Sequence, residues 1–315
     1  MEKFGVIEAA FDVFKRRDRR GVLFQAALGY VLILLVTTGV FLALSAPVLL
    51  DYLRWADELQ KTQKIGQLPP NVSSLLGGYF VFGLLGFAAL AAWESAAHRW
   101  LVRGEAGGGL MGLKIDAHFW NVLLCYLTWI PMYIGIVLLV VLVGGAGIGG
   151  GIASGGGLVG FLLGLVGVLA AIALGAYLPA RFAPASALSV ARGRYAFFEA
   201  WKATRGHALS LIGAFLLLFV GFYVVVFAIS VPMQGSANSL TGELVSGTDF
   251  LQALGSLGVF NIAILAAIYV AMMVFQLAFI SALFGVNAKL ARVATAAGMA
   301  ADTEPMASSA PSSAN

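Results

Sequence analysis

A carboxylate and an imidazole lie one helical turn apart near the end of the second apolar segment of the chain. Glu94 and His98 are four residues apart and would share one face of a helix. Such a pair could act as general acid and base, or as two ligands of a metal ion. A metal site needs at least a third ligand, which His118 or His207 could supply only if the fold brings it near. The alternative is that Glu94 and His98 simply pair with each other.

Basic side chains form two clusters that could bind phosphate groups. The first follows His98 and contains Arg99 and Arg103. The second combines basic residues with one tryptophan, and its members are Arg181, Arg192, Arg194, Trp201, Lys202 and Arg205. Arginine forks suit phosphate oxygens, so both clusters, with Glu94 and His98, form a candidate site for a lipid or a partner protein. The alternative is that these charges only fix the depth of helices among lipid headgroups.

Signatures of other chemistry are absent from the sequence. It contains no nucleophile elbow, zincin helix, acidic dyad or dinucleotide fingerprint, and the glycine run at 144–157 lacks the strand and the Gly-Lys-Ser/Thr of a phosphate-binding loop. Cys125 is the only cysteine, which excludes an intramolecular disulfide and a thiolate metal cluster. We therefore expect no catalytic residue, no metal and no cofactor.

Six apolar segments must position these residues, and each is long enough to cross a hydrocarbon core of about 30 Å. Of the 315 residues, 60% are hydrophobic and 11% are charged, which exceeds the apolar content of a soluble domain. The sequence thus predicts an all-α membrane protein with six transmembrane helices. The expected spans are Gly21–Leu49, Leu75–Trp93, Trp120–Val143, Leu158–Tyr177, Leu209–Val231 and Leu257–Ala288.

The distribution of lysine and arginine predicts which side of the membrane each loop faces. All of them except Arg54, Lys61 and Lys64 lie before the first span, between the second and third, between the fourth and fifth, or after the sixth. By the positive-inside rule these segments are cytoplasmic, so both termini should lie in the cytoplasm. The net charge of +4 is then a signal of topology, and we expect no nucleic-acid partner.

The spans form three expected hairpins, each preceded by a short amphipathic cytoplasmic helix at the membrane interface. The clearest is in residues 1–20, where Phe4, Ile7, Phe11 and Phe14 share a face. Such helices could anchor the hairpins, or could sense lipid or dock a partner. We expect a membrane domain at residues 21–292 and a disordered cytoplasmic tail at 293–315, which is rich in Ala, Ser and Pro.

Glycines mark two further places. The run Gly144–Gly157 is expected to form a tight or mobile external turn. Gly160 and Gly164 are four residues apart and allow close approach of another helix. That helix could belong to the same chain or to a second copy.

Two stretches resemble a known family of bacterial membrane proteins. They are Ala180–Ala185 followed by Phe198–Gly206, and His98–Glu105 followed by Gly109–Lys114. These residues resemble proteins similar to the membrane domain of glycerophosphodiester phosphodiesterases. The resemblance implies the six-span layout over about residues 5–295. It does not imply the phosphodiesterase activity, which belongs to a separate soluble domain.

These observations favour a non-enzymatic inner-membrane protein with a role in the cell envelope, which binds membrane lipids, a membrane protein partner or a second copy of itself at its cytoplasmic face. A transporter or flippase-like carrier of small uncharged or lipidic molecules is the alternative. The near absence of charge at midplane depth argues against an ion-coupled transporter. A membrane enzyme acting on lipid headgroups is a third possibility, and it would depend on Glu94 and His98.

Overall fold

The structure is a computed structural model that describes residues 4–15, 20–62, 72–105, 108–153, 155, 157–245 and 258–302. Within these residues the regular structure is helical, apart from an isolated bridge between Leu110 and Leu113. The helices are α1 (Val6–Ala10), α2 (Asp12–Lys15), α3 (Arg20–Thr62), α4 (Val72–Arg103), α5 (Ala117–Ala153), α6 (Gly157–Phe182), α7 (Ala185–Arg192), α8 (Glu199–Ala203), α9 (Ala208–Val245) and α11 (Gly258–Asp302).

Six of these helices, α3, α4, α5, α6, α9 and α11, are long and apolar enough to cross a membrane. This confirms the expectation of an all-α membrane protein. Little of each apolar stretch is buried inside the protein, from 0% of the most apolar window of α11 to 22% of that of α4. Their outward surfaces therefore require a lipid environment.

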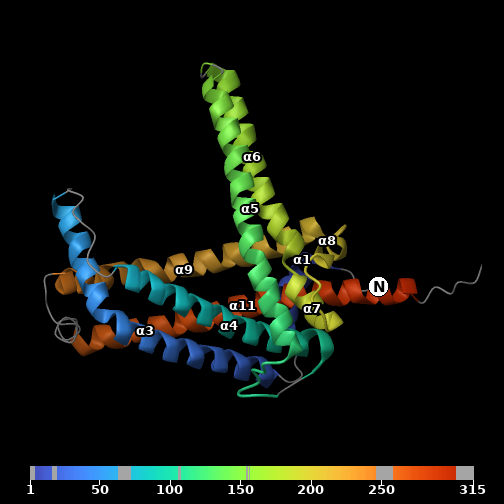
Figure 1. The fold of residues 1–315 in the computed structure, drawn as a ribbon, viewed down its shortest axis with the longest axis horizontal. Coiled ribbons are helices and arrows are strands. Elements are labelled where there is room, and N and C mark those ends of the chain that lie inside the picture. Colours follow the sequence, from blue (N-terminus) through green and yellow to red (C-terminus); the bar gives the residue numbers. More distant parts are fainter. Residues whose placement is uncertain are drawn as a thin grey trace, which may run out of the picture.

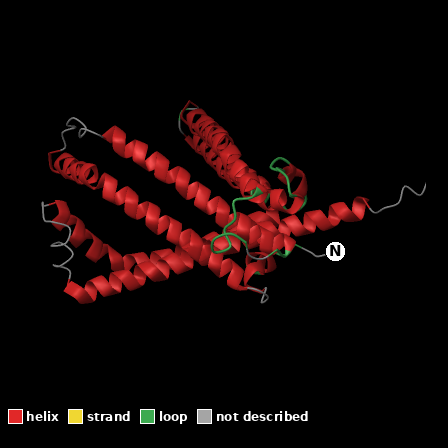
Figure 2. Ribbon diagram, turned by 60° about the horizontal axis from the view of Figure 1, so that its bottom comes forward, coloured by secondary structure: helices red, strands yellow, loops and turns green. Residues whose placement is uncertain are grey.

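Neighbouring long helices pack in pairs. α3 contacts α4, α5 contacts α6, and α9 contacts α11 (Figure 1). The first and third pairs run side by side, whereas α5 and α6 project away from them, as both ribbon views show (Figures 1 and 2). The short helices α1, α7 and α8 lie where the α5–α6 pair meets the other four helices.

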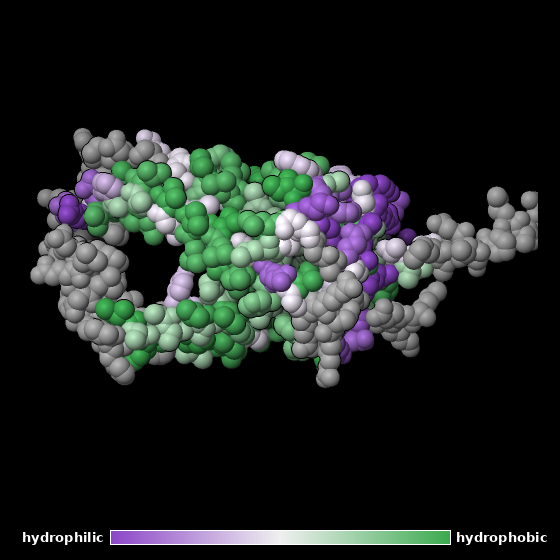
Figure 3. Space-filling model, turned by 90° about the horizontal axis from the view of Figure 1, so that it is seen from below, coloured by the Kyte–Doolittle hydropathy of each residue, from purple (hydrophilic) through white to green (hydrophobic). Residues whose placement is uncertain are grey.

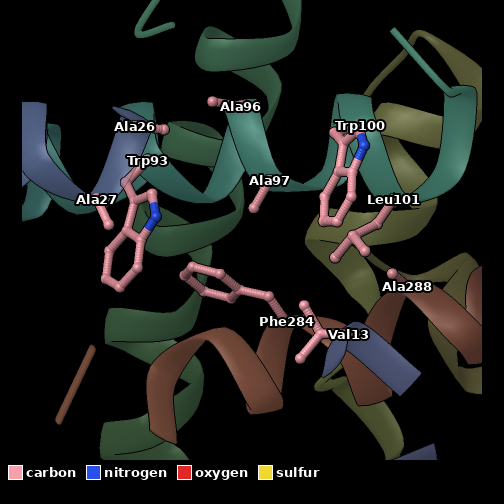
Figure 4. Packing of buried hydrophobic residues seen from close by; sticks show 10 residues of the cluster. All are labelled: Val13, Ala26, Ala27, Trp93, Ala96, Ala97, Trp100, Leu101, Phe284 and Ala288. Atoms are coloured by element: carbon pink, nitrogen blue, oxygen red, sulfur yellow. The ribbon is translucent and has the colours of Figure 1, made fainter. Parts of the chain in front are cut away.

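The best-packed part of the protein lies at this same end. Here α4 provides small residues and two tryptophans, and α11 provides Phe284, whose ring meets Trp93 edge-on at a centroid distance of 5.2 Å. Figure 4 shows the Phe284 ring pointing from α11 toward α4, with Val13 of the N-terminal segment beside it. Ala96 and Ala97 keep the α4 surface low enough for these neighbours to approach.

The glycine run differs from the expected external turn because most of it is helical. α5 continues to Ala153, and only residues 154–156 separate it from α6. The reason is backbone packing: a Cβ added at Gly147 would lie 2.5 Å from Cα of Gly167. At Gly151 it would lie 2.4 Å from the carbonyl oxygen of Gly160. The glycines thus allow α5 and α6 of one chain to touch.

Two of the expected short segments also differ from the sequence interpretation. The stretch before the third span is a loop with an isolated bridge rather than an amphipathic helix. Met111 and Gly112 have positive φ angles, which are incompatible with a right-handed α-helix. At the other end of the chain, α11 includes residues 293–302 of the segment expected to be a disordered tail. The alanine content of these residues favours helix, and residues 303–315 lie outside the described part.

Candidate functional site

Glu94 lies at the centre of a buried hydrogen-bond network that joins three helices. Its Oε1 lies 3.0 Å from Nε2 of His98, one turn along α4. The same oxygen accepts a hydrogen bond from the Ser186 hydroxyl of α7, and Oε2 accepts one from the Tyr126 hydroxyl of α5. The Glu94 and His98 side chains are 6% and 0% exposed. Because a buried carboxylate is costly unless its lone pairs are used, this network both satisfies Glu94 and joins α4, α5 and α7.

The network lacks the relay geometry of an activated serine. In a serine-histidine-carboxylate relay, one ring nitrogen faces the hydroxyl and the other faces the carboxylate. Here Glu94 and Ser186 both face Nε2 of His98, at 3.0 and 3.4 Å. His98 Nδ1 is buried and finds no hydrogen-bond partner within the described ranges. The hydroxyl of Ser186 is already donated to Glu94, so the arrangement supports binding or packing better than nucleophilic attack.

A third metal ligand is not brought to this pair. Asp116 accepts a hydrogen bond from the backbone amide of His118, and the His207 ring lies beside Phe4 at 5.8 Å. In the described part of the chain, no group of three or more His, Cys, Asp or Glu side chains is placed to hold a metal ion.

A cavity of about 610 Å³ lies against the network. Its walls come from α5, α6, α9 and α11, and its polar lining includes Glu94, Tyr126 and Ser186. Leu216 and Phe219 of α9 also line it and are 62% and 41% exposed, so it runs from the lipid-facing surface to a buried polar floor. This is a volume typical of small-molecule sites.

The arginines of the first cluster have separate roles. Arg99 is buried, and it donates to the Asp116 carboxylate at 3.1 Å and to the carbonyl oxygen of Gly112 at 3.3 Å. Asp116 also caps the start of α5, so Arg99 fixes the end of α4 to the start of α5. Arg103 is exposed and donates to Glu105 at 2.6 Å, which lowers the pKa of that carboxyl below its usual value.

Arg181 is buried against aromatic rings instead of facing phosphate. Its guanidinium lies 4.2 Å from the centroid of the Trp201 ring, and Nη2 donates to the carbonyl oxygen of Trp201 at 2.5 Å. The Thr204 hydroxyl donates back to the Arg181 carbonyl oxygen at 3.2 Å. Arg181 therefore holds the α8 segment against the end of α6, which makes it a structural residue of the cluster.

The remaining basic residues form an exposed surface around Glu199, which we call the basic surface. Arg192 pairs with Oε2 of Glu199, and Arg194 pairs with Oε1 at 2.7 Å. With Lys202, these residues line a pocket of about 440 Å³. Arg205 is exposed two residues beyond the end of α8.

Three residues of the site were not predicted from the sequence. Tyr126 and Ser186 reach Glu94 from other helices, and Asn287 lines the cavity from α11. The signal that could have drawn attention to Ser186 is its spacing from Ser189, which is three residues away in an otherwise apolar segment. Ser189 contacts the Cys125 thiol of α5 at 3.4 Å, whereas Ser186 donates to Glu94 of α4.

Comparison of the chain with models of known protein families, with curated proteins and with solved structures finds no match. The resemblance of residues 98–114 and 180–206 to the glycerophosphodiester phosphodiesterase membrane-domain family is therefore still a prediction.

Proposed function

We propose that this integral membrane protein binds anionic lipid headgroups on its basic surface, at the cytoplasmic face of a bacterial inner membrane, and catalyses no reaction there. The observation that carries the proposal is the pocket around Glu199. Three cationic side chains, Arg192, Arg194 and Lys202, line it with a single carboxylate. The excess positive charge suits a phosphate group, and the arginine forks suit its oxygens.

The distribution of polar surface supports the proposed orientation. Hydrophilic residues gather at the end that carries the short helices and loops, and a broad apolar zone adjoins it (Figure 3). We place this end in the cytoplasm by the positive-inside rule, with both termini on that side. The α3–α4 and α9–α11 pairs, which run side by side, then cross the bilayer as two hairpins, and we propose that α5–α6 crosses as a third hairpin when it tilts toward them in the membrane (Figure 1).

The surroundings of the pocket support a lipid as the bound partner. Phe198 and Trp201 belong to the α8 segment and are 66% and 40% exposed, next to the exposed side chains of Lys202 and Arg205. Exposed aromatic rings beside basic groups are typical of the membrane interface, where rings lie at acyl depth and cations lie among headgroups. We therefore assign the basic surface to lipid headgroups. If the protein shows no preference for anionic lipid, a protein partner becomes the favoured occupant of this surface.

Native mass spectrometry of the full chain tests this assignment. The wild-type protein and an R194Q/K202Q/R205Q variant would each be titrated with phosphatidylglycerol and with phosphatidylcholine. A matched control is R54Q, since Arg54 is an exposed arginine paired with Asp51 in the α3 segment. We expect preferential binding of phosphatidylglycerol, weakened at least about tenfold in the triple variant and unchanged in R54Q. Equal binding of both lipids, or unchanged binding by the triple variant, would reject the proposal.

A carrier of uncharged or lipidic molecules is the second candidate. It is favoured by the 610 Å³ cavity, which joins the lipid-facing surface to a polar floor. A carrier must move its cargo between leaflets, so reconstituted vesicles containing a fluorescent lipid would show accelerated exchange between leaflets. Exchange at the rate of protein-free vesicles would exclude this function for the lipid used.

A further inference from the structure

We propose that the cavity between α5–α6 and α9–α11 is a binding site for an uncharged single-chain lipid with a hydroxyl headgroup, such as a monoacylglycerol. Its acyl chain would lie between the apolar helices and its hydroxyl would meet the polar floor. This site is separate from the basic surface, and the proposal does not rest on anionic lipid binding.

The walls of the cavity suit a hydrocarbon chain. Trp129 of α5 and Ile212, Phe215 and Leu216 of α9 contribute large apolar side chains. Leu216 and Phe219 line the cavity and are 62% and 41% exposed, so the cavity opens on the apolar outer surface of these helices. A chain can therefore enter from the bilayer without passing through water, and the apolar walls offer it surroundings like those of the hydrocarbon core.

The floor offers a hydrogen-bonding atom that the protein itself does not use. Asn287 is 9% exposed and lines the cavity, and its Oδ1 has no hydrogen-bond partner among the described residues. A buried polar atom without a hydrogen-bond partner raises the free energy of the protein. A ligand that pairs with this atom removes that cost, which favours binding. A hydroxyl can both donate and accept, so it satisfies Asn287 whichever way the amide is oriented.

The charges of the floor favour a neutral headgroup over a charged one. No lysine or arginine side chain lines the described cavity, so an anionic headgroup would find no partner and would face the Glu94 carboxylate. A cationic headgroup would have to compete for that carboxylate with Ser186, Tyr126 and His98, which already contact its two oxygens.

Photocrosslinking of the full chain in nanodiscs tests the site. A monoacylglycerol with a diazirine in its chain would be activated by light, and its adducts would be mapped by peptide mass spectrometry. Competition with 1-oleoylglycerol, oleate and oleylamine reports the headgroup preference. A176F is designed to fill the cavity from its exposed wall, and A173F is its control, because Ala173 is exposed on the same helix but does not line the cavity.

We expect adducts on the α9 wall, with 1-oleoylglycerol competing at least about tenfold better than oleate or oleylamine. A176F should lose these adducts and A173F should keep them. N287L should lose the preference for 1-oleoylglycerol while still being labelled through the chain. Labelling spread over all lipid-facing helices, labelling unchanged in A176F, equal competition by a charged analogue, or a preference unchanged in N287L would each overturn the proposal. The R194Q/K202Q/R205Q variant should be labelled like the wild type, which separates this result from that of the basic surface.

Discussion

Arg292 near the end of the described chain donates from Nη2 to the carboxylate of Asp12 near its beginning, at 2.8 Å. Arg292 also donates from Nη1 to the carbonyl oxygen of Leu101 at 2.9 Å, so one guanidinium joins α2, α4 and α11. The Asp12 and Arg292 side chains are only 12% and 16% exposed. The N-terminal segment is therefore an integral part of the helix packing and not a peripheral anchor.

Replacing Asp12 with alanine should strongly destabilise the protein. The Arg292 charge would be left largely buried without its carboxylate, which typically costs about 3–5 kcal/mol. The control is D51A, which removes the exposed carboxylate paired with Arg54, and which should change the free energy of unfolding by no more than about 1 kcal/mol. Reversible unfolding in mixed micelles measures both variants. Equal effects of D12A and D51A would contradict a specific role for the Asp12–Arg292 pair.

A second ion pair predicts that the attachment of α1 depends on pH. The Nζ of Lys289 lies 2.9 Å from Oε1 of Glu8, and this lysine lowers the pKa of Glu8, with a smaller contribution from Lys15. Because the pKa of Glu8 is lower in the folded state, the stabilisation by this ion pair is complete at a pH above the pKa of the unfolded state, about 4.3. It is lost as the pH falls through the pKa of the folded state. We expect hydrogen exchange of residues 6–15 to show a loss of protection at acidic pH, in excess of the intrinsic change. E8Q should lack this part of the pH dependence.

The sequence predicted the long elements better than their arrangement. A span such as Leu209–Val231 is a local property, because an apolar run of this length is unstable in water whatever its neighbours. The Glu94–His98 contact was also predictable as an alternative, because the spacing of four residues brings side chains together in any helix. The structure has that contact, with Nε2 and Oε1 3.0 Å apart.

The rest of the site depends on tertiary packing that the sequence does not specify. The interpretation of Arg181 as a phosphate ligand followed from its residue type, whereas the structure stacks it on Trp201, twenty residues away. In the same way, Tyr126 meets Glu94 across 32 residues. The glycine run was interpreted as a turn because glycine lacks helix propensity, but contact between two helices in lipid can outweigh that preference at Gly147.

Two alanine substitutions in that run should have opposite effects. G147A would place a Cβ 2.5 Å from a backbone atom of Gly167, so the helices must separate, at a cost of about 1–3 kcal/mol. G149A meets nothing within 4 Å and should stabilise the helix by up to about 1 kcal/mol, because alanine is the better helix former. Thermal unfolding in detergent distinguishes them. A stabilising G147A would show that α5 and α6 do not pack through their backbones.

Arg181 should be sensitive to a change that keeps its charge. R181K removes the planar group stacked on Trp201 and the hydrogen bond to its carbonyl oxygen, so we expect a loss of stability of about 1–2 kcal/mol. The fluorescence of Trp201 should shift in the same variant. Comparison with W201F identifies the part of the emission that comes from Trp201. R205K changes an exposed arginine of the same segment and should leave both signals unchanged. Identical behaviour of R181K and R205K would contradict the structural role of Arg181.

The network around Glu94 should respond as a coupled unit rather than as separate hydrogen bonds. E94Q replaces one acceptor oxygen with an amide donor, which must face Ser186, Tyr126 or His98. This variant should lower the free energy of unfolding by about 2–4 kcal/mol. Y126F alone should cost about 1–3 kcal/mol, because it leaves a buried carboxylate oxygen without its donor.

The double variant E94Q/Y126F decides whether Glu94 and Tyr126 interact. If they do, the change in the free energy of unfolding of the double variant should differ from the sum of the changes in the two single variants by about 0.5–3 kcal/mol. The control cycle combines E94Q with T37V, since the Thr37 hydroxyl donates within α3 to the carbonyl oxygen of Ile33 at 2.8 Å. That cycle should be additive, because the two sites share no partner. Additivity in both cycles would mean that Tyr126 and Glu94 contribute independently, and the polar floor of the cavity would then have no common hydrogen-bond network.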